Sequence, residues 1–83
     1  MMLSQNDAIR IIELVRKLTE KRNACGGSHP YASFEYNGSY PQLHISLLPA
    51  MWYNFTDPEY VGKIGGKYKP LSEGIKMLEE LTS

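Results

Sequence analysis

The chain has 83 residues, enough for a single domain that buries only about 60 to 65 per cent of the surface exposed by its unfolded form. Its composition, 42% hydrophobic and 22% charged, excludes a disordered or fibrous protein, and no apolar run reaches the roughly 20 residues that span a bilayer. Nine Lys and Arg balance nine Asp and Glu, so the chain lacks the basic excess that is typical of nucleic-acid-binding domains.

The cysteine content and the first residues favour a cytoplasmic protein. Cys25 is the single cysteine, whereas small secreted domains are usually held by two or more disulfides. The first residues lead directly into an amphipathic segment with mixed charges, without the basic and apolar regions of a secretory signal. We therefore expect a soluble domain that spans residues 1–83 and works in the cytoplasm.

Residues 5–24 are predicted to form an amphipathic helix. Ser4 and Asp7 have the spacing of a capping box. Apolar residues then recur at intervals of three and four, as expected for one buried helix face; they are Ala8, Ile11, Ile12, Val15 and Leu18. The pair Gly26-Gly27 can adopt the left-handed conformation that ends a helix.

Residues 31–36 and 42–47 are predicted to form a β-hairpin. Apolar and polar residues alternate in both segments, which is typical of strands with one buried face. The register that places Ala32 opposite Leu43 and Phe34 opposite Pro41 puts the apolar residues on one face. Because proline cannot complete a hydrogen-bonded pair, we expect a four-residue loop at 36–39 or a β-bulge.

Residues 49–70 are rich in aromatic side chains and follow neither a helical nor a strand period. Within this segment we expect a short third strand over residues 50–55 and a two-turn helix over 58–64, capped by Asp57 and stopped by Gly65-Gly66. The last helix begins at residues 70–73. Its apolar stripe consists of Leu71, Ile75, Leu78 and Leu81, and Gly74 weakens its first turn by about 1 kcal/mol relative to alanine.

These elements predict an α+β fold made of a helix, a β-hairpin, a short strand or helix and a final helix. Because each long helix has one apolar stripe and the hairpin has one apolar face, both helices should pack on the same face of a small antiparallel sheet. The chain contains no internal repeat, so we expect one domain.

Few residues suggest catalysis or metal binding. Cys25 and His29 stand four residues apart, and His44 lies elsewhere in the chain. These residues could form a cysteine nucleophile with a histidine base, or part of a zinc site. Zinc usually requires about four ligands, and a nucleophile requires a base, an orienting group and a cleft. We therefore expect a non-enzymatic protein without metal or cofactor.

The aromatic segment is the best candidate for a binding surface. Aromatic side chains on irregular segments provide large contact areas at low entropic cost, and tryptophan and tyrosine dominate many protein interfaces. The residues that we predict to bind a partner are Trp52, Tyr53, Phe55, Tyr60, Lys63, Lys67 and Tyr68. The function indicated is a small regulator that contacts another protein, for example an inhibitor of the kind that phages and mobile elements carry against host defence.

Two alternatives involve other partners. Residues 60–69 combine glycines, tyrosines and three lysines, which is the combination used to bind single-stranded nucleic acid. A homodimer that pairs through an exposed strand edge is the other alternative, because so small a core gains stability from oligomerisation. A membrane partner is not expected.

Overall fold

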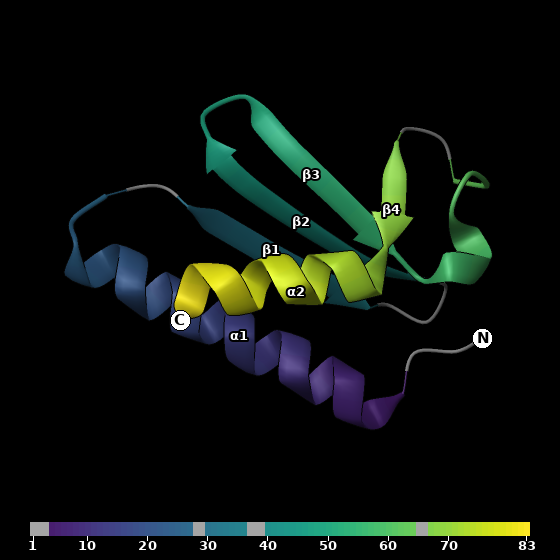
Figure 1. The fold of residues 1–83 in the computed structure, drawn as a ribbon, viewed down its shortest axis with the longest axis horizontal. Coiled ribbons are helices and arrows are strands. Elements are labelled where there is room, and N and C mark those ends of the chain that lie inside the picture. The colour runs from purple at the N-terminus through teal and green to yellow at the C-terminus, as the bar shows by residue number, and fades with distance from the viewer. Residues whose placement is uncertain (1–3, 28–29, 37–39, 65–66) are drawn as a thin grey trace.

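The computed structural model describes residues 4–27, 30–36, 40–64 and 67–83 (Figure 1). The elements, in chain order, are α1 (Gln5–Ala24), β1 (Tyr31–Tyr36), β2 (Pro41–Leu48), β3 (Met51–Thr56), the 3-10 helix η1 (Pro58–Tyr60), β4 (Tyr68–Pro70) and α2 (Leu71–Thr82). The four strands form one sheet in the order β1-β2-β3-β4, antiparallel except that β4 runs parallel to β3. The predicted α+β class is therefore confirmed, with a mixed sheet of four strands.

The boundaries of α1 agree with the prediction. The Ser4 hydroxyl accepts a hydrogen bond from the Asp7 amide at 3.1 Å and caps the first turn. At the other end Gly26 has a φ of +71°, and the amide of Gly27 donates to the Arg22 carbonyl at 3.3 Å. This arrangement is a Schellman motif, which requires a left-handed residue and so favours glycine.

The hairpin is confirmed, but its predicted register is wrong by two residues. Ala32 pairs with Ile45 and Phe34 pairs with Leu43, so large apolar residues lie opposite each other on the buried face. Pro41 becomes the first residue of β2, where the missing amide proton is tolerated. A shift of two residues leaves each side chain on the same face of the sheet, so the prediction of which hairpin residues face the core is correct. The predicted loop, residues 36–39, lies mostly outside the described residues.

The aromatic segment contains more regular structure than its sequence pattern suggests. Residues 51–56 form β3, which is paired with β2 along its whole length. The two-turn helix predicted over residues 58–64 is wrong, because only the 3-10 turn η1 forms, capped by a hydrogen bond from the Glu59 amide to Asp57 Oδ1 at 3.2 Å. Gly62, with a φ of +83°, turns the chain away immediately afterwards. The stop predicted at Gly65-Gly66 falls outside the described residues.

Both long helices lie on one face of the sheet (Figure 1), as predicted. The buried core between the two layers consists of Ile11, Leu14, Leu18, Ala32, Leu43, Ile45, Phe55, Leu71 and Leu78. α1 and α2 are joined by an ion pair from Arg10 to Glu79 at 3.1 Å and by a hydrogen bond from Lys21 Nζ to the Leu81 carbonyl at 3.1 Å. Neither helix is long and apolar enough to cross a membrane within the described part of the chain.

Gly74 is the point of closest approach between α2 and the sheet. It is buried, and a Cβ atom built at this position would lie 2.7 Å from both Leu43 Cδ2 and Phe55 Cγ. The absence of a side chain therefore lets the first turns of α2 settle directly on β2 and β3. The glycine that weakens the helix locally is used for packing.

Candidate protein-binding site

The edge of β3 that faces β4 is only half covered. β4 pairs with the second half of β3, at Asn54, Phe55 and Thr56. Among the described residues, no strand pairs with the same edge over Met51–Tyr53. Lys67 comes directly before β4, beside this uncovered part of the edge.

A pocket of about 230 Å³ lies at the edge of the sheet where β3 and β4 meet. It is lined by Trp52, Tyr53, Asn54, Lys67 and Lys69, which we call the Trp52 pocket. Three residues of the predicted binding surface, Trp52, Tyr53 and Lys67, are thus brought together. Asn54 was not predicted, and Lys69 was predicted only as part of the alternative nucleic-acid-binding segment 60–69. Their proximity to Trp52 depends on the parallel pairing of β3 with β4, which the sequence pattern of so short a strand does not reveal.

Trp52 lies on the sheet face opposite the helices and keeps 49% of its surface exposed. Its ring meets that of Tyr31 edge to face, with 6.0 Å between centroids and an interplanar angle of 87°. The guanidinium carbon of Arg22 lies 4.9 Å from the centre of the Tyr31 ring, within the range of a cation–π interaction. Ser46, which pairs with both Tyr31 and Trp52, is fully buried. The indole is therefore supported by its neighbours while half of it stays available.

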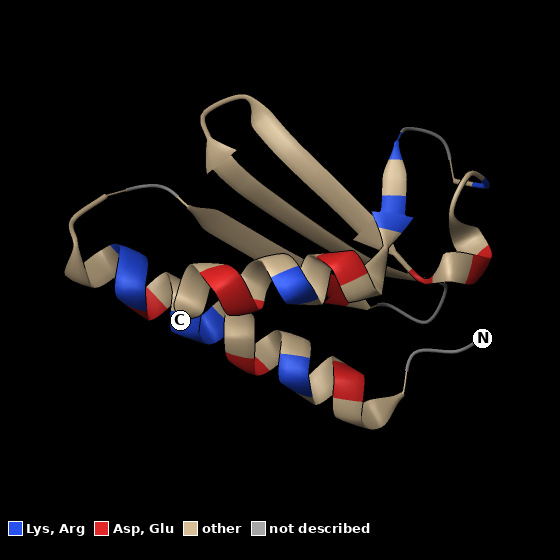
Figure 2. Cartoon of the chain, in the orientation of Figure 1, with Lys and Arg blue, Asp and Glu red and all other residues tan. Residues whose placement is uncertain are grey.

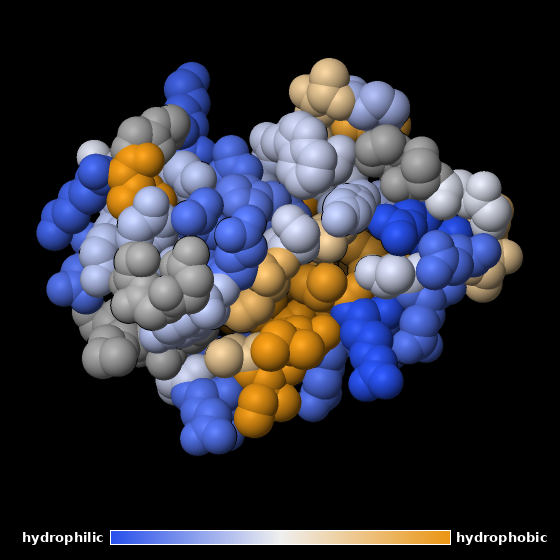
Figure 3. Space-filling model, turned by 180° about the vertical axis from the view of Figure 1, so that it is seen from behind, coloured by the Kyte–Doolittle hydropathy of each residue, from blue (hydrophilic) through white to orange (hydrophobic). Residues whose placement is uncertain are grey.

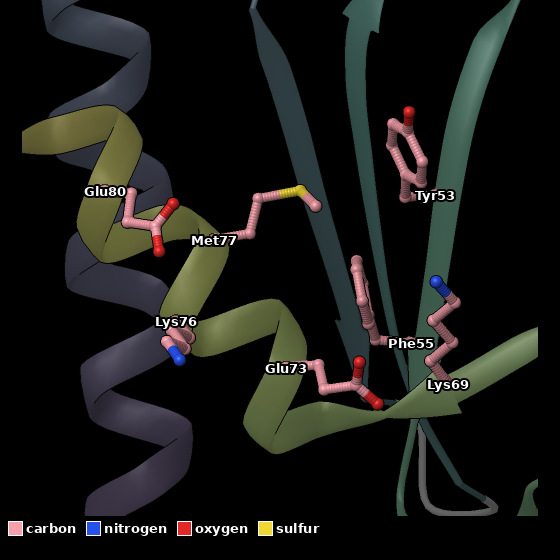
Figure 4. A pocket seen from close by; sticks show the side chains of 7 residues that line it. All are labelled: Tyr53, Phe55, Lys69, Glu73, Lys76, Met77 and Glu80. Atoms are coloured by element: carbon pink, nitrogen blue, oxygen red, sulfur yellow. The ribbon is translucent and has the colours of Figure 1, made fainter.

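Tyr53 points to the other side of the sheet, where a second pocket of about 340 Å³ separates β3 and β4 from α2 (Figure 4). Met77 extends from α2 toward the strands, and Phe55 lies deep in the pocket. Charged side chains from both sides complete its lining: Lys69 from β4, with Glu73, Lys76 and Glu80 from α2. Because Tyr53 and Lys69 line both pockets, the two hollows adjoin at the open edge of β3.

Phe55 is a core residue, so its prediction as a surface contact is wrong. Only 1% of its surface is exposed, and its ring lies against Gly74. Successive side chains of β3 point to opposite faces of the sheet, which directs Phe55 toward the helices and Asn54 away from them. The sequence pattern predicts one irregular aromatic surface, whereas strand alternation divides the aromatic residues between the two faces of the sheet.

The remaining predicted residues lie outside the Trp52 pocket. Tyr60 is half-buried against Tyr40, with 5.4 Å between ring centroids. Tyr68 is half-buried too, and its hydroxyl donates to Gln42 Oε1 at 3.3 Å. Lys63 is exposed in the turn that follows η1. The two tyrosines are thus engaged by other side chains of the same molecule.

Charge is distributed unevenly around the site (Figure 2). β2 and β3 contain no Asp, Glu, Lys or Arg, whereas Lys67 comes directly before β4 and Lys69 is its middle residue. Both lysines are exposed. The Trp52 pocket therefore combines an uncharged aromatic wall with positive charge on its rim, while the larger pocket beside α2 has lysines and glutamates.

The residues considered for metal binding and catalysis are not gathered in one place by the described part of the fold. Cys25 is exposed at the end of α1. His44 lies on the outer sheet face with Nδ1 2.6 Å from Asn54 Oδ1; it pairs with Ser33, where the predicted register had placed it opposite Tyr31. His29 is outside the described residues, among which no three His, Cys, Asp or Glu side chains form a metal-binding group.

Comparisons of the chain with models of protein families, with characterised proteins and with solved structures gave no significant match.

Proposed function

We propose that this chain is a non-enzymatic binding protein that contacts another protein through the Trp52 pocket. The observation that carries the proposal is the half-exposed indole of Trp52 in a pocket rimmed by Lys67 and Lys69. Tryptophan is among the residues most enriched at the energetic centres of protein interfaces. A large aromatic side chain that is already held by its neighbours loses little entropy when a partner covers it.

The uncovered edge of β3 defines how the partner binds. Among the described residues no strand pairs with Met51–Tyr53 on this edge, so an extended segment of the partner can continue the sheet there. An apolar side chain of that segment would enter the Trp52 pocket, and acidic side chains beside it would complement Lys67 and Lys69. The partner is thus a protein with an exposed, acidic and partly apolar segment.

The cellular role included in this proposal is that of a small regulator or inhibitor in the cytoplasm, of the kind that phages and mobile elements carry. A domain of 83 residues acts most readily by covering a surface of its target, because it has little volume in which to enclose a substrate. The pockets described above are open hollows at a sheet edge, which suits this mode of action.

The test begins with capture of partners by the tagged wild-type chain, beside Trp52→Ala and the control Leu48→Ala. Leu48 is 57% exposed and lies at the end of β2, which pairs with the β3 strand of Trp52, but it does not line the pocket. The captured protein is then purified and titrated by calorimetry. We expect Trp52→Ala to weaken its binding at least about tenfold and Leu48→Ala to leave it unchanged. Equal affinity of all three chains would refute the proposal.

Single-strand nucleic acid is the second candidate, favoured because Lys67 and Lys69 line the same pocket as the half-exposed Trp52. Positive charge and an aromatic stacking surface are the two components of such sites. Fluorescence anisotropy with a labelled oligo-dT strand tests this candidate at several salt concentrations. Affinity that falls steeply with salt and is lost in Lys67→Ala and Trp52→Ala would support nucleic acid over protein.

A further inference from the structure

The two edges of the sheet differ in their protection against pairing. β4 is three residues long and includes Lys69 and Pro70, and short strands, lysine and proline are devices that prevent edge-to-edge association. β1, at the other edge, is six residues long, has no Lys, Arg or Pro, and pairs with β2 without a register shift. Among the described residues, no strand covers its outer side.

α1 packs along β1 and places exposed apolar side chains beside this edge. Arg10 and Lys21 contact α2, and at 100° per residue Ile12 lies on the opposite side of α1 from both. Because α2 packs on β2, β3 and β4 while α1 packs on β1 (Figure 1), Ile12 lies on the side of α1 that is turned away from α2. Ile12 is 56% exposed and Ile9, one turn away, is 45% exposed. Seen from behind, apolar surface gathers in one patch over α1 and the neighbouring edge of the sheet (Figure 3).

We infer that a second copy of this chain binds here, pairing its β1 with β1 in the antiparallel sense. The two four-stranded sheets then form one continuous sheet, and the two α1 helices approach each other on the side that carries Ile12. This surface lies at the opposite edge of the sheet from the Trp52 pocket. The inference is therefore independent of the proposed function, and a dimer would present two Trp52 pockets at its two ends.

The sequence of β1 fits its own copy. In two registers near the centre of β1 the helices of both copies lie on the same side of the joined sheet. One register has Ser33 opposite Ser33, and the other has Phe34 opposite Phe34. In these registers the single charged residue of β1, Glu35, lies opposite Tyr31 or Ser33 of the second copy and never opposite another Glu35. Among the helix-facing residues, Ala32 falls opposite Phe34 in the first register, and in the second Phe34 falls opposite Phe34 and Ala32 opposite Tyr36. A two-fold interface requires such self-complementarity.

Sedimentation equilibrium of the full chain between about 1 μM and 1 mM tests the inference, and the result expected is a reversible monomer–dimer equilibrium. Ile12→Lys places a charge in the contact between the two helices, and Tyr36→Lys places one in the contact between the two β1 strands. Ile12 is 56% exposed and Tyr36 is 44% exposed. We expect each variant to weaken dimerisation at least about tenfold, since two charges enter each dimer. Leu48→Lys, which changes an equally exposed residue at the far end of the hairpin, should leave it unchanged. Circular dichroism verifies that the variants fold.

A spin label gives the geometry of the pair. In the chain with Cys25→Ser and Glu35→Cys, antiparallel pairing at either register brings the two labels within about 25 Å, because they are separated by a few residues along adjacent strands. A monomer throughout the concentration range would overturn the inference. So would a dimer that is weakened by Leu48→Lys instead of by Ile12→Lys and Tyr36→Lys, or one with labels far apart.

Discussion

Replacement of Gly74 by alanine tests whether packing or helix propensity dominates at the contact between α2 and the sheet. Alanine is about 1 kcal/mol more favourable than glycine inside a helix, so propensity alone predicts a more stable protein. In the structure, however, the added Cβ would lie 2.7 Å from Leu43 Cδ2 and Phe55 Cγ. Both side chains are almost completely buried and have no solvent to move into.

Overpacking of a closed core costs about 1 to 3 kcal/mol. Three atoms of Leu43 and Phe55 lie within 3 Å of the added carbon, so we take the upper half of this range. After the gain in propensity is subtracted, Gly74→Ala should lower the free energy of unfolding by about 1 to 2 kcal/mol. Urea denaturation followed by circular dichroism measures the change.

Ser72→Ala is the matched control, because Ser72 lies in the same turn of α2 and is exposed. It should keep or slightly raise stability. Shortening the neighbour in Gly74→Ala/Leu43→Val should cost less than the sum of the two single changes, because the two positions share one contact. A Gly74→Ala protein as stable as the wild type would refute the packing argument.

Two further predictions concern the helices. Gly26→Ala should destabilise the protein by about 1 kcal/mol in urea denaturation, because Gly26 has a φ of +71°, which is unfavourable for alanine. A Cβ there would meet no other atom, so the cost comes from the backbone alone. Unchanged stability would show that the left-handed end of α1 is unimportant. The side chains of Arg10 and Glu79 are 51% and 48% exposed. A double-mutant cycle on this pair should give a coupling free energy below about 1 kcal/mol that disappears in 1 M salt. A coupling that persists in salt would contradict the screened, exposed character of the pair.

The parts of the fold that were predicted correctly are those with strong local signals. α1 has a cap, a long apolar stripe and a glycine end, and both its boundaries agree with the prediction. The alternation in the hairpin gave the correct faces, although the register differed because it depends on which side chains meet across the sheet. The fold class could be predicted because each long helix has one apolar stripe and the hairpin has one apolar face, and these three surfaces have to be buried against one another.

The parts that were missed depend on contacts between distant residues. The pairing of β4 with β3 involves three residues on each strand, too few for a periodic pattern, and it determines which lysines stand beside Trp52. Phe55 could have been assigned to the core from strand alternation alone. The packing role of Gly74 could not, because it depends on the positions of Leu43 and Phe55 in three dimensions.

The contact between α1 and α2 joins segments made at opposite ends of the described chain. During synthesis α1 leaves the ribosome long before α2, so its stripe of Ile11, Leu14 and Leu18 has no complete partner layer in the meantime. Contacts between distant segments must wait for the later one and slow folding. Because the hydrophobic layer closes only when α2 has emerged, the nascent chain passes through an interval in which chaperones can bind it, and a ribosome stalled within α2 would hold it there.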